Sequence, residues 1–153
     1  MDQMPRHDSK KEVVTILPFI GDRVLMQLRD FNAHIKHPGH WGYFSGSIHE
    51  GERSAHAAKR ELFEEIGYTP NELIELGRLS TADQEGLVVY LYSCSIRIPL
   101  EELVLGEGLD MALVAPKEIL SKMIYSKALK KFFPVAETSI IAEALAIALA
   151  SRK

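Results

Sequence analysis

Runs of apolar residues, separated by short polar and glycine-containing segments, predict several short strands along the chain. Val- and Ile-rich or aromatic segments bounded by Gly, Pro and Asp are typical of strands. They cover Glu12 to Ile20, Val24 to Arg29, Trp41 to Phe44, Leu73 to Ala82, Leu87 to Ile98 and Leu109 to Val114. Gly21-Asp22 is a turn signal, so the first two strands are predicted to form a hairpin.

Helical periodicity is clearest from Ser54 to Ile66, where Ser54 is the predicted N-cap and Gly67 occupies the position of a left-handed C-terminal residue. Steps of 100° place one apolar stripe toward the core. The stripe consists of Ala55, Ala58, Leu62 and Ile66. Further helices are predicted over Pro116 to Met123, Ser126 to Phe133 and Thr138 to Ala150.

The order of these elements mixes strands and helices without strict alternation. This pattern predicts an α/β protein of the α+β type, in which one mixed sheet is covered by helices. Residues 1–10 are polar and are expected to be a flexible N-terminal tail, and residues 11–153 are expected to form one domain.

Composition narrows the function classes. The net charge of −3 argues against broad nucleic-acid binding but leaves a local basic patch open. The single cysteine, Cys94, is expected to be a buried structural thiol. With no apolar signal segment and no membrane span, we expect a cytoplasmic protein that does not associate with membranes. The apolar stretch from Val135 to Ala150 is either core or the interface of a homodimer.

Three glutamates on the Ser54 to Ile66 helix carry the clearest chemistry. Glu61, Glu64 and Glu65 are three and four residues apart and fall within about 100° of each other on the helical wheel. Like charges at this spacing repel unless a cation lies among them, and hard oxygen ligands favour Mg²⁺ or Mn²⁺. Taken alone, the cluster is more readily interpreted as a solvated acidic face, since charge runs are usually solvated.

The sequence around this helix favours the interpretation of the three glutamates as a cation-binding site. From Gly46 to Tyr68 the chain reads GSIHEGERSAHAAKRELFEEIGY. It resembles the Nudix box at its fixed positions, which here are Gly46, Glu52, Arg60, Glu61, Leu62, Glu64, Glu65, Gly67 and Tyr68. Two positions depart from the common pattern: Tyr68 replaces an aliphatic residue, and Ser47 replaces a second glycine.

The resemblance implies an α/β/α sandwich with a central mixed sheet and a divalent metal held by the box. It makes Glu61, Glu64 and Glu65 metal ligands, adds the carbonyl of Gly46, and gives Glu52 a role through water or as an orienting group. Arg60 would position the glutamates by charge-assisted hydrogen bonds. The expected cofactor is Mg²⁺, with Mn²⁺ as the alternative, and Glu64 or Glu65 would take the proton from the attacking water.

Four residues outside these positions are weighed for catalysis or substrate contact. Glu107 is either an additional ligand or base, as a late-loop glutamate is in many relatives, or an ordinary loop carboxylate. Arg29 and His49 would approach a phosphate, and Trp41 would stack on a base; solvated Arg and His side chains and a core Trp are the alternatives.

The resemblance therefore predicts a pyrophosphohydrolase whose partner is a small nucleotide diphosphate. The leading hypothesis is Mg²⁺-dependent hydrolysis of the diphosphate in a nucleotide sugar or an ADP-ribose-like compound, by water attack at phosphorus. The second is a housecleaning hydrolase of nucleoside triphosphates, which releases pyrophosphate. The third is a nucleotide-binding regulator without catalysis.

Overall fold

The computed structural model describes residues 11–80, 86–136 and 139–152, so the predicted tail over residues 1–10 lies outside the described residues. The elements run in the order β1 (Lys11–Ile20), β2 (Arg23–Leu28), β3 (Trp41–Gly42), β4 (Phe44–Ser47), α1 (Ser54–Ile66), β5 (Ile74–Ser80), β6 (Leu87–Ser95), the short 3-10 helix η1 (Leu100–Glu102), β7 (Asp110–Val114), α2 (Pro116–Leu120), β8 (Met123–Ser126), β9 (Lys131–Pro134) and α3 (Ser139–Ser151).

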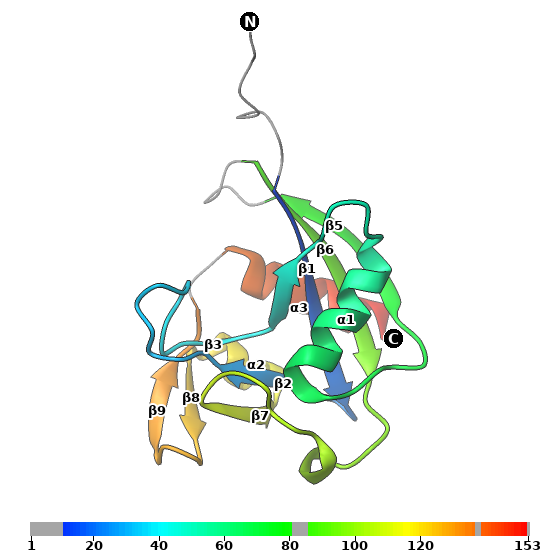
Figure 1. Ribbon diagram of the computed structural model, residues 1–153. Helices are drawn as coiled ribbons and strands as arrows, with labels where there is room; N and C mark the ends of the chain where they lie inside the picture. Colours follow the sequence, from blue (N-terminus) through cyan, green and yellow to red (C-terminus); the bar gives the residue numbers. More distant parts are fainter. Residues whose placement is uncertain (1–10, 81–85, 137–138, 153) are drawn as a thin grey trace, which may run out of the picture.

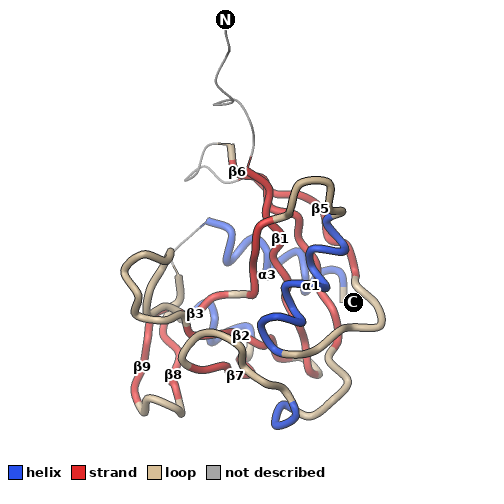
Figure 2. Tube along the Cα trace, in the orientation of Figure 1, coloured by secondary structure: helices blue, strands red, loops and turns tan. Residues whose placement is uncertain are grey.

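A mixed sheet forms the centre of the molecule. Strand β1 pairs in parallel with β6 and antiparallel with β2 and β4, and β5 runs antiparallel to β6. The strand order is β3-β2-β1-β6-β5, with β4 attached to β1 and β7 attached to β2 (Figure 2). The predicted mixed sheet is confirmed, and so is the antiparallel pairing of the first two strands.

Helices α1 and α3 cover opposite faces of this sheet (Figure 1). Alternate residues of β1 point to opposite faces, as the period of a strand requires. Val14 and Ile16 pack with Leu62 of α1, whereas Leu17 belongs to the cluster that contains Leu145 of α3. The α/β/α sandwich is therefore confirmed. Among the described residues, no helix is long and apolar enough to cross a membrane.

The helix predicted over Ser126–Phe133 is wrong, because these residues form the turn and second strand of a hairpin. Strands β8 and β9 pair antiparallel, with Tyr125 opposite Phe132. Lys130 adopts a positive φ of 58° and its N–H donates to the carbonyl of Ser126 at 2.8 Å, which closes the turn. Burial alternates along β8, and Phe133 is the buried residue of β9, so the two strands pack one face of the hairpin on the core.

Other boundaries also differ from the sequence prediction; β6, for example, ends at Ser95 rather than Ile98. Helix α2 ends at Leu120 rather than Met123, because Lys122 adopts a φ of 73° that a right-handed helix does not allow. The predicted strand from Trp41 to Phe44 is divided at Tyr43 into β3 and β4. As a result, the first residues of the predicted box loop lie in a strand of the sheet.

The start of α1 also differs in detail. The N-cap residue is Arg53, without a side-chain capping bond, and the hydroxyl of Ser54 instead contacts the hydroxyl of Tyr92 on β6 at 2.6 Å. Ala57 is buried while Ala55 is exposed, so the buried stripe is shifted from the predicted one. The shift turns Ala57, on the same side as the glutamates, toward the sheet.

Candidate metal and catalytic site

Arg60 ties the loop before α1 to the acidic face of that helix. Its Nε and Nη2 donate to the two carboxylate oxygens of Glu52 at 2.8 and 3.0 Å. Its Nη1 donates to Glu61 at 2.9 Å and lies 3.5 Å from Glu64, while Nη2 also donates to the carbonyl of Ser47 at 2.9 Å. Forked, charge-assisted bonds of this kind fix both distance and orientation.

Glu52 has both oxygens committed to this arrangement. The bonds from Arg60, together with the backbone N–H of His49 at 2.9 Å, hold the pKa of Glu52 at about 2. Its carboxylate is therefore ionised at every physiological pH and is directed at Arg60. This geometry fits a role for Glu52 in orienting the metal ligands better than it fits a role as a direct ligand.

Glu61 lies directly against Gly46 of β4. A Cβ at position 46 would overlap the Glu61 carboxylate, so no residue with a side chain fits there without moving Glu61. Burial raises the pKa of Glu61 above its ordinary value, and the bond from Arg60 opposes the rise. Glycine at this position therefore lets the helix carboxylate reach the backbone of the strand.

Glu65 is the buried carboxylate of the group. Its side chain is 8% exposed, and no hydrogen-bond donor among the described residues reaches its Oε1. Burial raises the pKa of Glu65 to about 7, and the neighbouring charges of Glu107 and Glu61 add to the rise. A buried carboxylate oxygen without a donor is costly unless a cation approaches it.

Glu107 belongs to this group because its loop docks on the end of α1. The N–H of Gly106 donates to the carbonyl of Glu65 at 2.7 Å, and a Cβ at position 106 would overlap the carbonyl of Glu64. The charge of Glu107 acts on Glu65 and Glu61 and raises the pKa of each. Glu64 itself is exposed at the rim, next to Arg60.

These residues suit a hard divalent cation. The donors are carboxylate and carbonyl oxygens, and the buried Oε1 of Glu65 together with three neighbouring carboxylates calls for positive charge. Over the described part of the chain, no three His, Cys, Asp or Glu side chains already converge as a cage. Mg²⁺ retains several water ligands and needs only one or two carboxylates, so a partly formed protein site is compatible with it.

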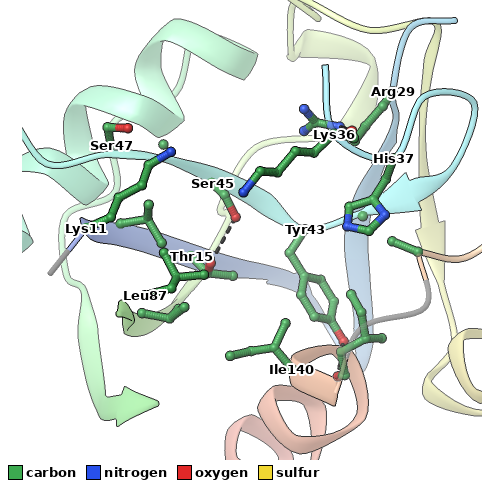
Figure 3. Close-up of a pocket in the computed structure, with 16 residues that line it drawn as sticks. Lys11, Thr15, Arg29, Lys36, His37, Tyr43, Ser45, Ser47, Leu87 and Ile140 are labelled. Atoms are coloured by element: carbon green, nitrogen blue, oxygen red, sulfur yellow. Dashed lines mark hydrogen bonds between the residues drawn. The ribbon is translucent and has the colours of Figure 1, made fainter. Parts of the chain in front are cut away.

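A cavity of about 330 Å³ lies on the opposite face of the sheet (Figure 3). Its floor comes from Val13 and Thr15 of β1, which point away from α1, and its far wall comes from Ile141 of α3. The hydroxyl groups of Thr15 and Ser45 lie 2.9 Å apart inside it. Gly46 lines the cavity too, so β4 separates this cavity from the carboxylates.

Two of the residues weighed for phosphate or base contact lie near these features, and one does not. Arg29 lines the cavity and its charge lowers the pKa of Glu65, so it faces both. His49 is exposed in the box loop, beside Glu52. Trp41 is fully buried and its indole N–H donates to the carbonyl of Ile124 at 3.0 Å, so base stacking by Trp41 is excluded in this structure.

Of the residues that line the cavity, sequence reasoning assigned only Arg29 to the substrate. Thr15, Ser45 and Tyr43 come from different elements, and Tyr43 donates from its hydroxyl to the carbonyl of Ile141 at 3.0 Å. The one available signal was Thr15, a polar residue inside an otherwise apolar strand. Cys94 is buried and its burial raises the thiol pKa to about 12, so it takes no part in either feature.

Comparisons with known proteins agree with this geometry. A family model described as the NUDIX domain matches residues 10–134. The crystal structure of the MutT protein from Methanosarcina mazei Go1 gives a TM-score of 0.69 at 16% identity, over 95% of this chain and 97% of that one. A comparison with curated proteins found no match.

Two further solved structures have the same fold. The NUDIX domain of Shewanella oneidensis NrtR, complexed with ADP ribose, gives a TM-score of 0.66 at 16% identity, over 95% of this chain and 90% of that one. The E. coli ORF135 protein gives a TM-score of 0.66 at 20% identity, over 97% and 96%. At these identities the structural likeness concerns the fold.

Proposed function

The chain belongs to the NUDIX domain family. We propose that it is a pyrophosphohydrolase that hydrolyses the diphosphate of a nucleoside diphosphate derivative with Mg²⁺, or Mn²⁺, as cofactor. The observation that carries this proposal is the buried Oε1 of Glu65, which lacks a donor among the described residues and lies beside three further carboxylates.

Each residue of the acidic group has a distinct part in this proposal. Glu61, Glu65 and the carbonyl of Gly46 hold the cation, and Glu64 at the exposed rim completes the group from the solvent side. Arg60 and Glu52 position the ligands. When bound, a divalent cation neutralises the charge of the diphosphate and makes water a better nucleophile.

Water attacks at phosphorus, and its proton passes to a carboxylate of the chain. Glu64 and Glu65 are the two candidates on α1, and Glu107 is the third, because its loop is fixed against the end of that helix. Arg29 faces both the acidic group and the cavity, so it is suited to bind a phosphate that lies between them.

The cavity supports a substrate with a nucleoside on one side of the diphosphate. It combines an apolar wall, a hydroxyl pair and cationic residues, which suits a base or sugar attached to phosphates. The substrate would pass around β4, with the diphosphate at the carboxylates and the nucleoside in the cavity. The ADP ribose bound to the NrtR domain supports an ADP-ribose-like or nucleotide-sugar substrate.

A nucleoside triphosphate is the second candidate, because the same box residues could act on either kind of phosphoanhydride. The two reactions differ in their products. Hydrolysis of a diphosphate derivative releases a nucleoside monophosphate, whereas hydrolysis of a triphosphate in this manner releases pyrophosphate. A non-catalytic regulator remains the third hypothesis, although all the box glutamates are present.

The deciding experiment is a panel of nucleotide sugars, ADP-ribose and nucleoside triphosphates, with products identified by mass spectrometry with and without Mg²⁺. Glu64→Gln and Glu65→Gln should each lower kcat by about 100-fold or more, since each removes a ligand or base. The matched control is Glu75→Gln, an exposed carboxylate on β5. Full activity in both test variants, or turnover that ignores the metal, would reject the proposed site.

A further inference from the structure

Exposed hydrophobic side chains gather at one end of the molecule, away from the site described above. Nine large hydrophobic side chains are exposed among the described residues, and five of them fall between residues 120 and 132. These five are Leu120, Met123, Tyr125, Leu129 and Phe132. Such concentration on one short segment is typical of an interaction surface.

The β8–β9 hairpin presents these side chains on its outer face. Tyr125 lies opposite Phe132, and their rings pack edge to face with centroids 5.2 Å apart, while 58% of Phe132 is exposed. The alternate residues Ile124 and Phe133 are buried and fix the inner face to the core. In Figure 1 the hairpin, at the lower left, projects from the sheet as a separate ribbon.

Exposed lysines lie on and beside the hairpin. Lys122, Lys127, Lys130 and Lys131 are all exposed, and no acidic residue occurs between Leu120 and Ala136, although the whole chain carries a net charge of −3. Lys122 and Lys130 adopt positive φ angles of 73° and 58°. A lysine at such an angle is less stable than glycine, so charge is retained here at the expense of backbone conformation.

Lys131 alternates with Phe132, and its ammonium group lies 5.3 Å from the centroid of the Phe133 ring, so it belongs to the inner side of the hairpin. The acidic group that contacts the turn is Asp110 of β7, which accepts hydrogen bonds from Ser126 and Ala128.

Contrary to the sequence expectation of no membrane association, we propose that this hairpin surface, made of Met123, Tyr125, Leu129 and Phe132 with Lys122, Lys127 and Lys130, binds the face of an anionic lipid bilayer. Apolar side chains enter the boundary between headgroups and acyl chains, and lysines contact the anionic headgroups. The aliphatic side chains of this surface, Met123 and Leu129, favour contact with lipid over contact with the bases of a nucleic acid. A second copy of this chain is a poor partner, because two lysine-rich faces would repel.

The first experiment measures co-sedimentation of the full chain with vesicles of phosphatidylcholine alone and with ~30% phosphatidylserine. We expect binding only to the anionic vesicles, and we expect it to weaken as salt is raised, because the headgroup attraction is screened. The double variant Lys122→Gly/Lys130→Gly removes two charges and relieves both positive φ angles. At about fivefold per lysine, its binding should fall about 25-fold.

The second experiment tests the apolar contribution with a matched pair. Phe132→Ser should reduce vesicle binding, whereas Phe63→Ser should not; the two phenylalanines are 58% and 59% exposed, and Phe63 lies on α1. The glycine variant should unfold at the same temperature as the parent or higher, which separates lost binding from lost folding.

Three results would overturn the proposal. One is equal binding to neutral and anionic vesicles, and another is an equal loss of binding in Phe63→Ser and Phe132→Ser. The third is the absence of vesicle binding while the hairpin variants weaken the binding of a single-stranded oligonucleotide or an acidic peptide, which would assign the surface to that partner. None of these results bears on the hydrolytic activity, which is measured without vesicles.

Discussion

At the scale of single residues, Glu65 joins two features that rarely occur together in a folded protein. It is buried, and its Oε1 has no donor among the residues that the structure describes. Burial, and then the charge of Glu107, raises its pKa to about 7 from the ordinary value of 4.5. In the absence of metal, ionisation of this group therefore opposes folding.

The metal-free protein should lose stability as the pH rises through this range. Between pH 4.5 and about 7 the folded protein binds more protons than the unfolded chain at this position, so the contribution of Glu65 is complete below pH 4.5 and lost as pH rises through 7. We expect a loss on the order of 1–2 kcal/mol. Urea unfolding in a chelator at about pH 5 and about pH 8 measures it.

Glu65→Gln removes the ionisable group while keeping its shape, so this variant should show a flatter pH dependence and exceed the parent in stability above pH 7. The same substitution should lower the activity, so we expect stability and activity to move in opposite directions. A pH dependence identical to that of the parent would show that Glu65 is not the titrating group.

Gly46 allows a second test at this scale, because its missing side chain makes room for Glu61. Gly46→Ala should displace the Glu61 carboxylate and lower metal affinity by about 10-fold or more. In the background of Glu61→Ala, the overlap has no partner, so the added methyl group should have little further effect. Isothermal titration with Mn²⁺ measures all four proteins; additive losses would contradict the contact.

At the scale of elements, the loop before β7 connects the end of α1 to the sheet. The N–H groups of Val104 and Gly106 donate to the carbonyls of Ile66 and Glu65 at 3.1 and 2.7 Å, and Leu109 donates to Leu28 of β2 at 2.8 Å. These bonds use carbonyls that the helix end leaves without partners. The loop is thereby held with Glu107 beside the other carboxylates.

Gly106→Ala should detach this loop. A Cβ at this position would overlap the carbonyl of Glu64, which is backbone and cannot move aside. We expect a loss of about 1–3 kcal/mol in stability, faster hydrogen exchange over the loop, and a fall in kcat. Val104→Ala, an exposed position in the same loop, is the control. Unchanged exchange in Gly106→Ala would show that the loop does not depend on this contact.

The sequence predicted the elements whose patterns of apolar and polar residues lie within their own segments. Alternation predicted the central strands, and the spacing of the box predicted α1 and the carboxylates that it presents. The β8–β9 hairpin was missed because its turn contains Lys130 at a positive φ, where glycine or asparagine normally marks a turn. For Trp41 the sequence left base stacking and a core position as alternatives, because an aromatic residue on a strand does not reveal whether it is buried.

The cavity could not be predicted, because no single segment contains it. It is built from β1, β4, β6 and α3 and from the loop after β2, which become neighbours only when the sheet forms. Its position depends on alternation in β1, where Val13 and Thr15 face α3 while Val14 and Ile16 face α1. A shift of one residue in the register of β1 would exchange the two faces.

At the scale of the whole molecule, the two faces of the sheet are suited to different roles, one to cation binding and the other to substrate binding. The carboxylates that suit a cation gather on the α1 side, and the cavity with the hydroxyls of Thr15 and Ser45 opens on the α3 side. Substitutions on the α1 side should therefore lower kcat for every substrate. Substitutions in the cavity should change KM and should do so differently for different nucleotides.

Thr15→Val tests this division, because valine keeps the shape of threonine and removes only its hydroxyl. The Thr15 and Ser45 hydroxyls lie 2.9 Å apart, so one of them has a hydrogen left to donate to a ligand. We expect KM to rise about 3- to 10-fold with kcat within about twofold of the parent, whereas Glu64→Gln should lower kcat at similar KM. Thr69→Val, on an exposed loop, is the matched control. If Thr15→Val lowers kcat as strongly as Glu64→Gln does, the cavity is not a separate binding region, and the substrate would have to lie wholly on the α1 side of the sheet.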